Sequence, residues 1–219
     1  MGTRGLIVIK KDKKYRLAKY NHCDSYPSCL GYSIVEFLKK LKNIENFKNQ
    51  VDYLKMVSTT EFKNYSEEIK EIYYSLDLND ILVADEEIIT PNEIEFVKES
   101  LCEWAYVIDL DLNTFEIYKG NNKKPLTPGE RFYDEKGKGD YYYYPVKLFA
   151  KFDLVKLPLY KELKKMDKSD FENKSINNKR KKSEKVKPKW TIFYRCNKCN
   201  KESKTKENFC PSCGSKMNK

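Results

Sequence analysis

Residues 104–119 read Trp104-Ala-Tyr-Val-Ile-Asp-Leu-Asp-Leu-Asn-Thr-Phe-Glu-Ile-Tyr-Lys119, and this stretch decides the fold class that the sequence predicts. Apolar and aromatic residues alternate with other residues over Trp104–Leu110 and over Thr114–Lys119, a pattern typical of β-strands. Between the two runs, Asp111–Asn113 supplies turn-forming residue types. The stretch therefore predicts an antiparallel β-hairpin.

Two carboxylates, Asp109 and Asp111, lie beside the turn of this hairpin with one residue between them. Alternate residues of a strand point to the same face of a sheet, so the pair could bind a cation. The simpler interpretation is an entry into a turn, with both carboxylates solvated.

The first twenty residues predict another hairpin, because Leu6–Lys10 and Tyr15–Tyr20 are β-like runs separated by Lys11–Lys14. Capping patterns and apolar residues at helical spacing predict four helices between the hairpins. These are a helix opened by Ser33-x-x-Glu36, one carrying Ile44, Phe47, Val51 and Leu54, one over Ser66–Leu76, and one capped by Thr90-Pro91 that runs to Cys102. Hairpins that flank helices predict an α+β fold with a mixed, largely antiparallel sheet.

A further strand is expected over Tyr141–Leu148, after a loop rich in Gly, Lys and Asp. The four tyrosines at 141–144 could stack on nucleic-acid bases. Alternating strand faces explain the aromatic run more simply.

Charge is divided unevenly along the chain. Residues 1–160 carry 24 Lys/Arg and 26 Asp/Glu, a net −2, whereas residues 161–189 carry 12 against 5 and residues 190–219 carry 7 against 2. All of the excess positive charge therefore belongs to the tail. Together with the loss of apolar periodicity, this division predicts three parts: an α+β domain over residues 1–162, a basic flexible linker over 163–189, and a zinc ribbon over 190–219.

The zinc ribbon is predicted from two Cys-x-x-Cys knuckles, Cys196-x-x-Cys199 and Cys210-x-x-Cys213. Four soft thiolates at this spacing suit one structural Zn²⁺ in tetrahedral coordination. Two disulfides are the alternative, and a reducing compartment disfavours them. A segment this short buries too little apolar surface to fold alone, so the metal would supply most of its folding free energy.

Several classes are excluded by what the sequence lacks. No run of about 18 apolar residues is present, so no membrane partner is expected. The chain does not open on a secretory-signal pattern, and a cytoplasmic or nuclear location is expected. Walker, Gly-x-Gly-x-x-Gly, His-Glu-x-x-His and Gly-x-Ser-x-Gly motifs are absent, so common nucleotide-binding and protease chemistries are unsupported.

Candidate chemistry concentrates near the N-terminus. His22 is the only histidine and lies two residues from Asp24, so it could act as a general base. A hydrogen-bonded turn that Pro27 closes is the simpler interpretation. A metal site made of His22, Cys23 and Cys29 is conceivable, although its spacing matches no known pattern.

The blocks Met1-Gly-Thr-Arg-Gly-Leu6 and Tyr20-Asn-His-x-Asp-Ser-Tyr-Pro-Ser-x-Leu-Gly31 resemble the opening of a widespread, largely uncharacterised family of small proteins. A later block, Tyr106 to Tyr118, is also similar to this family. The resemblance covers scattered blocks within the first 120 residues and departs at Cys29, where a glycine is usual. It implies kinship and carries no known activity.

The same region has a weaker similarity to N-terminal-nucleophile hydrolases, which implies Thr3 as nucleophile with Asn21 and Asp24 across the hairpin. Removal of Met1 exposes Gly2 rather than Thr3, so Thr3 would lack the α-amino group that serves as base. Alternatively, Arg4, His22 and Asp24 could bind a phosphate or carboxylate without chemistry.

Two hypotheses about function remain. The first is a binding protein whose zinc ribbon and basic linker dock on nucleic acid or on a protein complex, although solvation alone could explain the lysine run. The second is a small hydrolase or transferase with its site at Thr3, Arg4, Asn21, His22 and Asp24, so enzymatic activity is left open.

Overall fold

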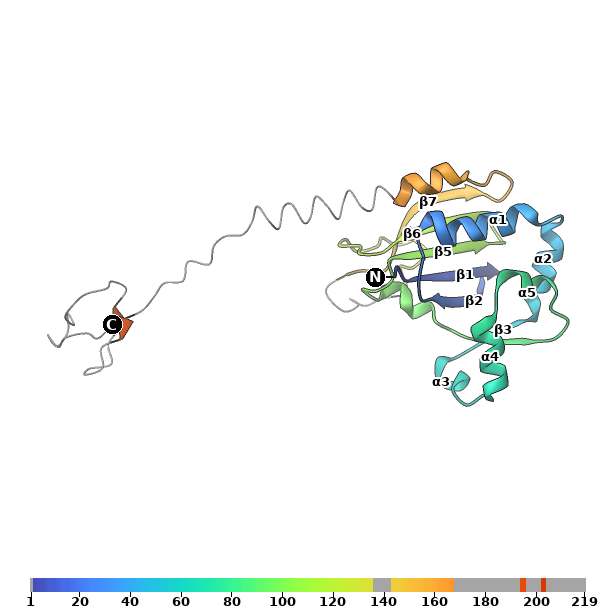
Figure 1. Ribbon diagram of the computed structural model, residues 1–219, viewed down its shortest axis with the longest axis horizontal. Coiled ribbons are helices and arrows are strands. Elements are labelled where there is room, and N and C mark those ends of the chain that lie inside the picture. Colours follow the sequence, from blue (N-terminus) through green and yellow to red (C-terminus); the bar gives the residue numbers. More distant parts are fainter. Residues whose placement is uncertain (1, 136–142, 168–193, 196–201, 204–219) are drawn as a thin grey trace. The chain divides into compact units, whose positions relative to one another are not determined.

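The computed structural model describes residues 2–135, 143–167, 194–195 and 202–203. These residues form helices together with a mixed, mostly antiparallel sheet, so the predicted α+β class is confirmed (Figure 1). The chain divides into two compact units, Met1–Asp170 and Phe171–Lys219. Within the second unit, β8 (Tyr194–Arg195) and β9 (Glu202–Ser203) pair antiparallel.

Both predicted hairpins are confirmed. β1 (Gly5–Lys11) pairs antiparallel with β2 (Lys14–Asn21), and β5 (Trp104–Asp109) pairs antiparallel with β6 (Thr114–Lys119). The first hairpin closes at Asp12 and Lys13, which have φ values of 55° and 62°. Positive φ at both central residues is what a two-residue hairpin turn requires.

The two hairpins lie side by side in one five-stranded sheet of order β2-β1-β5-β6-β7. β1 and β5 are parallel neighbours in this sheet, with Ile7 opposite Tyr106, and every other pairing in it is antiparallel. β2 returns the chain to the end of the sheet where β1 starts, since Asn21 pairs with Gly5, and the helical segment then leads to Trp104 at the same end. The order therefore brings the start of the chain against its middle.

Five α-helices are described between the hairpins. They are α1 (Tyr32–Lys40), α2 (Ile44–Gln50), α3 (Thr59–Phe62), α4 (Glu67–Ser75) and α5 (Leu78–Leu82). The predicted third helix, Ser66–Leu76, corresponds to α4. The predicted second helix ends earlier than expected, because a 3₁₀ turn at Val51–Tyr53 leads into the strand β3 (Leu54–Val57).

The capping box expected from Ser33 and Glu36 is wrong. A π-helical turn, η1 (Pro27–Gly31), continues directly into α1, whose N-cap Gly31 already has helical backbone angles. Ser33 Oγ instead donates a hydrogen bond to the Cys29 carbonyl oxygen at 3.2 Å. Because helical backbone precedes α1, its first N–H groups face carbonyl groups of the preceding turn and need no side-chain cap.

The helix expected between Thr90 and Cys102 is also wrong. Ile88–Pro91 forms the strand β4, which pairs in parallel with β3, and only the short 3₁₀ helix η3 (Ile94–Lys98) follows. Proline suits the first position of a helix, but here it is the last residue of a short strand, where its missing N–H disrupts no ladder.

The strand expected over residues 141–148 lies later in the chain. β7 (Lys147–Asp153) begins where the prediction ended, and Tyr144 makes only an isolated bridge with Asn122. Tyr141 and Tyr142 lie outside the described residues. β7 pairs with β6 and so extends the second hairpin to three strands.

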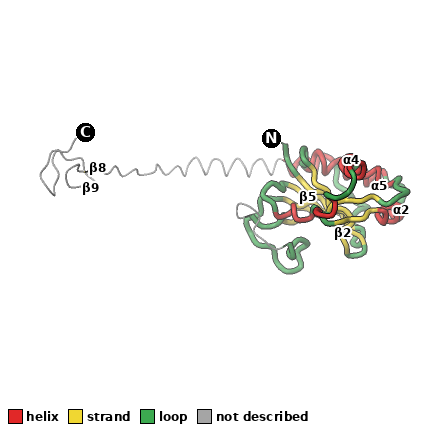
Figure 2. Tube along the Cα trace, turned by 90° about the horizontal axis from the view of Figure 1, so that it is seen from below, coloured by secondary structure: helices red, strands yellow, loops and turns green. Residues whose placement is uncertain are grey.

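The core has two layers, one on each face of the sheet. One cluster contains Trp104, Tyr106 and Ile108 of β5 together with residues of α1 and α2, and the other contains Ala105 and Val107. Helices cover the first face, whereas η3 and loop segments cover the second (Figure 2). The second face is therefore the one where side chains of loops and of η3, rather than α-helices, meet the sheet.

The body extends beyond residue 162, where composition placed the start of the linker. A helix covers residues 160–167, and Leu163 is fully buried in the cluster on the α1 face. Burying Leu163 offsets the cost of ordering this charged segment. Most of the predicted linker and ribbon, including all four knuckle cysteines, lies outside the described residues.

Candidate functional site

The segment before β1 and the segment after β2 meet at Ser25, which is fully buried. Ser25 N donates to the carbonyl oxygen of Thr3 at 3.1 Å, and Ser25 Oγ accepts from Asn21 Nδ2 at 2.7 Å. The Tyr106 hydroxyl of β5 donates to the Ser25 carbonyl oxygen at 2.7 Å. The two opening blocks thus form one hydrogen-bonded junction over the central strands.

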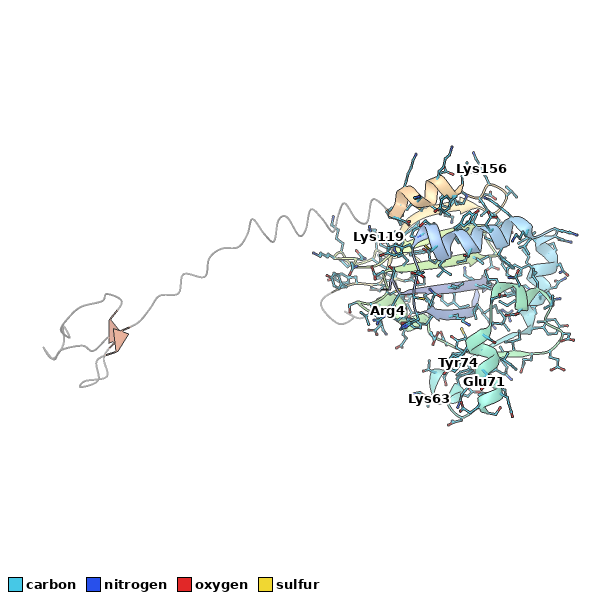
Figure 3. All side chains as sticks on the ribbon, in the orientation of Figure 1. Arg4, Lys63, Glu71, Tyr74, Lys119 and Lys156 are labelled. Carbon is cyan, nitrogen blue, oxygen red and sulfur yellow. The ribbon has the colours of Figure 1, made fainter. Side chains whose placement is uncertain are left out.

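The residues expected to form a catalytic group are brought together only in part. The structure places Thr3 in the interior, Arg4 and Asn21 half-buried, and His22 and Asp24 on the surface. Arg4 lies at the end of the sheet where β1 starts, the end at which Lys119 of β6 also lies (Figure 3). Within the described part of the chain, no hydrogen bond or ion pair joins Thr3, Arg4, His22 and Asp24 to one another.

The two residues of the nucleophile–base hypothesis face different surroundings. The Thr3 hydroxyl oxygen is buried and has no hydrogen-bond partner, and the residue is 1% exposed. The Nδ1 atom of His22 lies 3.2 Å from the hydroxyl of Tyr20 and is exposed to solvent. A nucleophile needs a base within hydrogen-bonding reach, and this arrangement supplies none for Thr3.

Asp24 has a structural reason for its place in the block. Its φ is 51°, in the left-handed region that Asp tolerates better than most residues, and its carbonyl oxygen accepts from Leu30 N at 3.2 Å. Cys29, where the resembled family usually has glycine, is not among the described residues with positive φ. Here the backbone therefore does not require glycine at that position.

A charged cluster that the sequence did not reveal lies on the loop-covered face of the sheet. The Arg131 guanidinium contacts Asp109 Oδ2 at 2.5 Å and Glu116 Oε2 at 2.8 Å. Asp109 and Glu116 come from the neighbouring strands β5 and β6, and their side chains are 0% and 3% exposed. Lys10 of β1 lies 3.3 Å from Asp109, and Lys151 of β7 lies 3.0 Å from Glu116. Four strands and one loop therefore converge on two buried carboxylates.

The expectation that Asp109 and Asp111 are solvated carboxylates at a turn is wrong for Asp109. Asp109 is buried under Arg131, whereas Asp111 is partly exposed and accepts hydrogen bonds from the N–H groups of Asp12 and Lys13 at 2.7 and 2.8 Å. One carboxylate thus holds the turn of the first hairpin, and the other belongs to the ion cluster.

Both carboxylates of the cluster are held in their charged form. Burial alone would raise the pKa of Asp109, but the hydrogen bonds and charge of Arg131 outweigh burial and lower it. The same balance lowers the pKa of Glu116, with Tyr118 and Lys151 contributing. Burial, followed by the nearby Glu116, raises the pKa of the Tyr118 phenol. None of these three groups can therefore exchange a proton readily near neutral pH.

A cavity of about 450 Å³ opens beside this cluster. The charged and phenolic residues that line it are Lys10, Tyr15, Glu116, Tyr118, Glu130, Arg131 and Lys151, and the apolar ones are Leu112, Leu126, Phe132, Val146 and Leu148. A cavity of this size lined by both polar and apolar side chains is typical of small-molecule sites. Among the described residues, no group of His, Cys, Asp or Glu has the arrangement of a metal site.

Comparison with protein-family models, with curated proteins and with solved structures finds no match for this chain. Among the described helices, none has the length and apolar content needed to cross a membrane. The predicted zinc ligands Cys196, Cys199, Cys210 and Cys213 lie outside the described residues.

Proposed function

We propose that this chain is a binding protein whose basic tail attaches it to nucleic acid. The observation that carries the proposal is the division of charge, because residues 161–189 have a net charge of +7 and residues 1–160 a net charge of −2. A lysine-rich arm neutralises backbone phosphates and releases condensed counterions, and this favours binding without regard to sequence. The near-neutral body would then be the part that the tail brings to the nucleic acid.

The geometry of the N-terminal junction favours binding over catalysis as the role of the chain. The Thr3 hydroxyl has no base beside it, and the only histidine contacts Tyr20 at the surface. The hydrolase or transferase hypothesis would need these groups to rearrange, whereas the tail needs no defined geometry to bind phosphates. We accordingly infer that the partner of the tail is nucleic acid.

Neutralising the centre of the basic segment tests the proposal. Replacing Lys179, Arg180, Lys181 and Lys182 by glutamine in the full chain is expected to lower affinity for a duplex oligonucleotide at low salt. The slope of log K against log salt is negative. If each of these residues neutralises one phosphate, the slope should become less steep by up to about 3.6, which is about 0.9 for each phosphate left without its cation. Fluorescence anisotropy over a salt series measures both quantities.

The matched control removes the same charge from the body. Lys14, Lys40, Lys63 and Lys123 are all exposed, and their replacement by glutamine should leave the slope nearly unchanged. Equal losses of affinity in the two quadruple variants would contradict a role for the tail. Retention of binding after deletion of Phe171–Lys219, which leaves the first compact unit whole, would also contradict it. Binding to an acidic protein with no affinity for oligonucleotides would replace nucleic acid with a protein partner.

We also propose that Cys196, Cys199, Cys210 and Cys213 hold one structural zinc ion. In support, β8 ends at the residue before Cys196, and β9 begins three residues after Cys199. The first Cys-x-x-Cys pair thus falls between two short antiparallel strands, the usual position of a knuckle in a zinc ribbon.

Metal analysis of the purified chain is expected to give one zinc per molecule. Replacing Cys196 by serine should abolish stoichiometric zinc, because a structural site needs all four ligands. The exposed thiol Cys23 provides the matched control, since Cys23→Ser should leave the zinc content at one. A full complement of zinc in Cys196→Ser, or its loss in Cys23→Ser, would refute the assignment.

A further inference from the structure

We propose that the cavity beside Arg131 binds a small organic anion, a carboxylate or phosphate monoester with an apolar body. The site lies in the first compact unit and does not depend on the tail, so it stands or falls separately from nucleic-acid binding. The balance of hydrogen-bond donors and acceptors in the cavity wall is what selects an anion.

The buried acceptors of the cluster are saturated. Asp109 Oδ1 accepts from the N–H groups of Asp111 and Leu112, and Oδ2 accepts from Lys10 and Arg131. The two oxygens of the second carboxylate, Glu116, are also each in contact with two groups. These are Thr114 and Lys151 at Oε1, and Arg131 and Tyr118 at Oε2. A carboxylate oxygen offers two lone-pair positions, so neither carboxylate has one left for a ligand.

The donors of the cluster are in excess. A guanidinium carries five N–H groups and an ammonium three. The carboxylates take one hydrogen from Nε and one from Nη2 of Arg131, and Tyr15 is a further partner of this guanidinium. Lys10 contacts two carboxylates and Lys151 one. All three cations therefore keep N–H groups for a ligand, and a donor-rich wall selects an acceptor-rich group such as a carboxylate or phosphate.

Solvent exposure also makes the cations, rather than the carboxylates, available to a ligand. The side chains of Lys10 and Lys151 are 21% and 44% exposed, whereas those of Asp109 and Glu116 are nearly inaccessible. A bound anion would therefore meet positive charge at contact distance, with the compensating negative charge behind it. Glu130 also lines the cavity, but its carboxylate accepts from Thr127 N at 2.6 Å and pairs with Lys147.

The apolar lining residues determine the rest of the ligand. Leu126, Val146 and Leu148 offer aliphatic surface against which a ring or a short chain can lose water. A volume of about 450 Å³ is that of a small-molecule site. The ligand is therefore a compact molecule with one anionic end and one apolar end.

The probe for the test is 8-anilinonaphthalene-1-sulfonate, an anion with an apolar ring system that fluoresces when shielded from water. A titration of the full chain at moderate salt is expected to give saturable binding at one site. The double variant Lys10→Met/Lys151→Met should bind at least about tenfold more weakly, because it can no longer form charge-assisted hydrogen bonds to the sulfonate. The neutral analogue N-phenyl-1-naphthylamine should also bind at least about tenfold more weakly than the sulfonate, for the same reason.

Two further variants distinguish binding of the probe in the cavity from general effects of net charge and of folding. Lys40→Met/Lys63→Met removes two exposed lysines elsewhere on the body and should change affinity less than about twofold. Leu112→Trp places a larger side chain at the 57% exposed edge of the cavity and should block the probe without changing charge. Thermal unfolding of each variant identifies any loss of binding that comes from loss of folding.

Competition identifies the anionic group. Displacement of the probe by 1-naphthyl phosphate or by 1-naphthoate supports the proposal and shows which head group the site prefers. Displacement by neither overturns it, as would equal affinity for the neutral analogue or unchanged binding in both Lys10→Met/Lys151→Met and Leu112→Trp. Because none of these measurements involves nucleic acid, their failure leaves the proposed role of the tail untouched.

Discussion

Replacing Arg131 by alanine is expected to lower the free energy of unfolding by about 3–5 kcal/mol. Arg131 is the shared partner of Asp109 and Glu116, whose side chains are 0% and 3% exposed. Without the guanidinium, two carboxylates would remain buried with too little compensating charge, and desolvation of an unpaired charge is costly. Urea unfolding of wild-type and variant chains at neutral pH measures the difference.

The pH dependence of this loss has a defined sign. The pKa values of Asp109 and Glu116 are held below their ordinary values of 3.8 and 4.5 by Arg131, so the pair stabilises the fold fully above the ordinary values. That contribution is lost as pH falls through the lowered pKa values of the folded state. In Arg131→Ala, burial without the guanidinium should instead raise both pKa values, and protonation would remove the unpaired buried charges. The stability difference between the two chains should therefore shrink on acidification from pH 7 to pH 4.

Two comparisons test whether unpaired buried charge causes the loss of stability in Arg131→Ala. Lys147→Ala removes a cation whose pair with Glu130 is largely solvated, with side chains 47% and 28% exposed, and should cost less than about 1 kcal/mol. Combining Arg131→Met with Asp109→Asn and Glu116→Gln removes all three charges and should recover much of the loss. A pH-independent loss, or one no larger than that of Lys147→Ala, would show that the cluster contributes little.

The hairpins could be predicted because their signal is local. Alternating residues over residues 104–119, and two β-like runs separated by the polar run Lys11–Lys14, specify strands and turns without reference to the rest of the chain. Among the predictions that failed, the Thr90-Pro91 helix and the 141–148 strand depended on tertiary context. Proline suits the start of a helix and also the end of a short strand, and only the parallel pairing with β3 decides between them.

The charged cluster could not be predicted because its parts are distant in sequence. Glu116 lies between Phe115 and Ile117 in a strand that reads as amphipathic, and such a position ordinarily faces solvent. The loop that carries Arg131 buries it instead, and no periodicity links that loop to β5. The N-terminal block did carry a local signal, but its junction at Ser25 shows why a motif need not be catalytic. Its residues satisfy the backbone where β1, β2 and β5 meet.

Adding one methyl group at Gly120 is expected to destabilise the fold by at least about 3 kcal/mol, at the upper end of the range for overpacked positions. A Cβ atom there would lie 1.7 Å from the carbonyl oxygen of Cys102, a buried residue shortly before β5. Gly120 also donates its N–H to the Glu103 carbonyl oxygen at 2.9 Å, so both backbones are fixed. Neither can move away without breaking the β5–β6 register. Chemical unfolding of Gly120→Ala measures the effect.

Gly5 and Gly2 complete a graded series that separates close packing from other effects of alanine. At Gly5 a Cβ atom would lie 2.7 Å from Ser25 Cβ and 2.8 Å from the Trp104 carbonyl oxygen, so a loss of about 1–3 kcal/mol is expected. At the exposed Gly2 the nearest atom would be Cys23 Cβ at 3.2 Å. Because alanine restricts the unfolded chain, Gly2→Ala should be neutral or stabilising by up to about 1 kcal/mol. From most to least stable, the predicted order of the variants is therefore Gly2→Ala, Gly5→Ala, Gly120→Ala. Gly5→Ala gives a measurable value even if Gly120→Ala does not fold, and a stable Gly5→Ala would mean that the junction at Ser25 is not tightly packed.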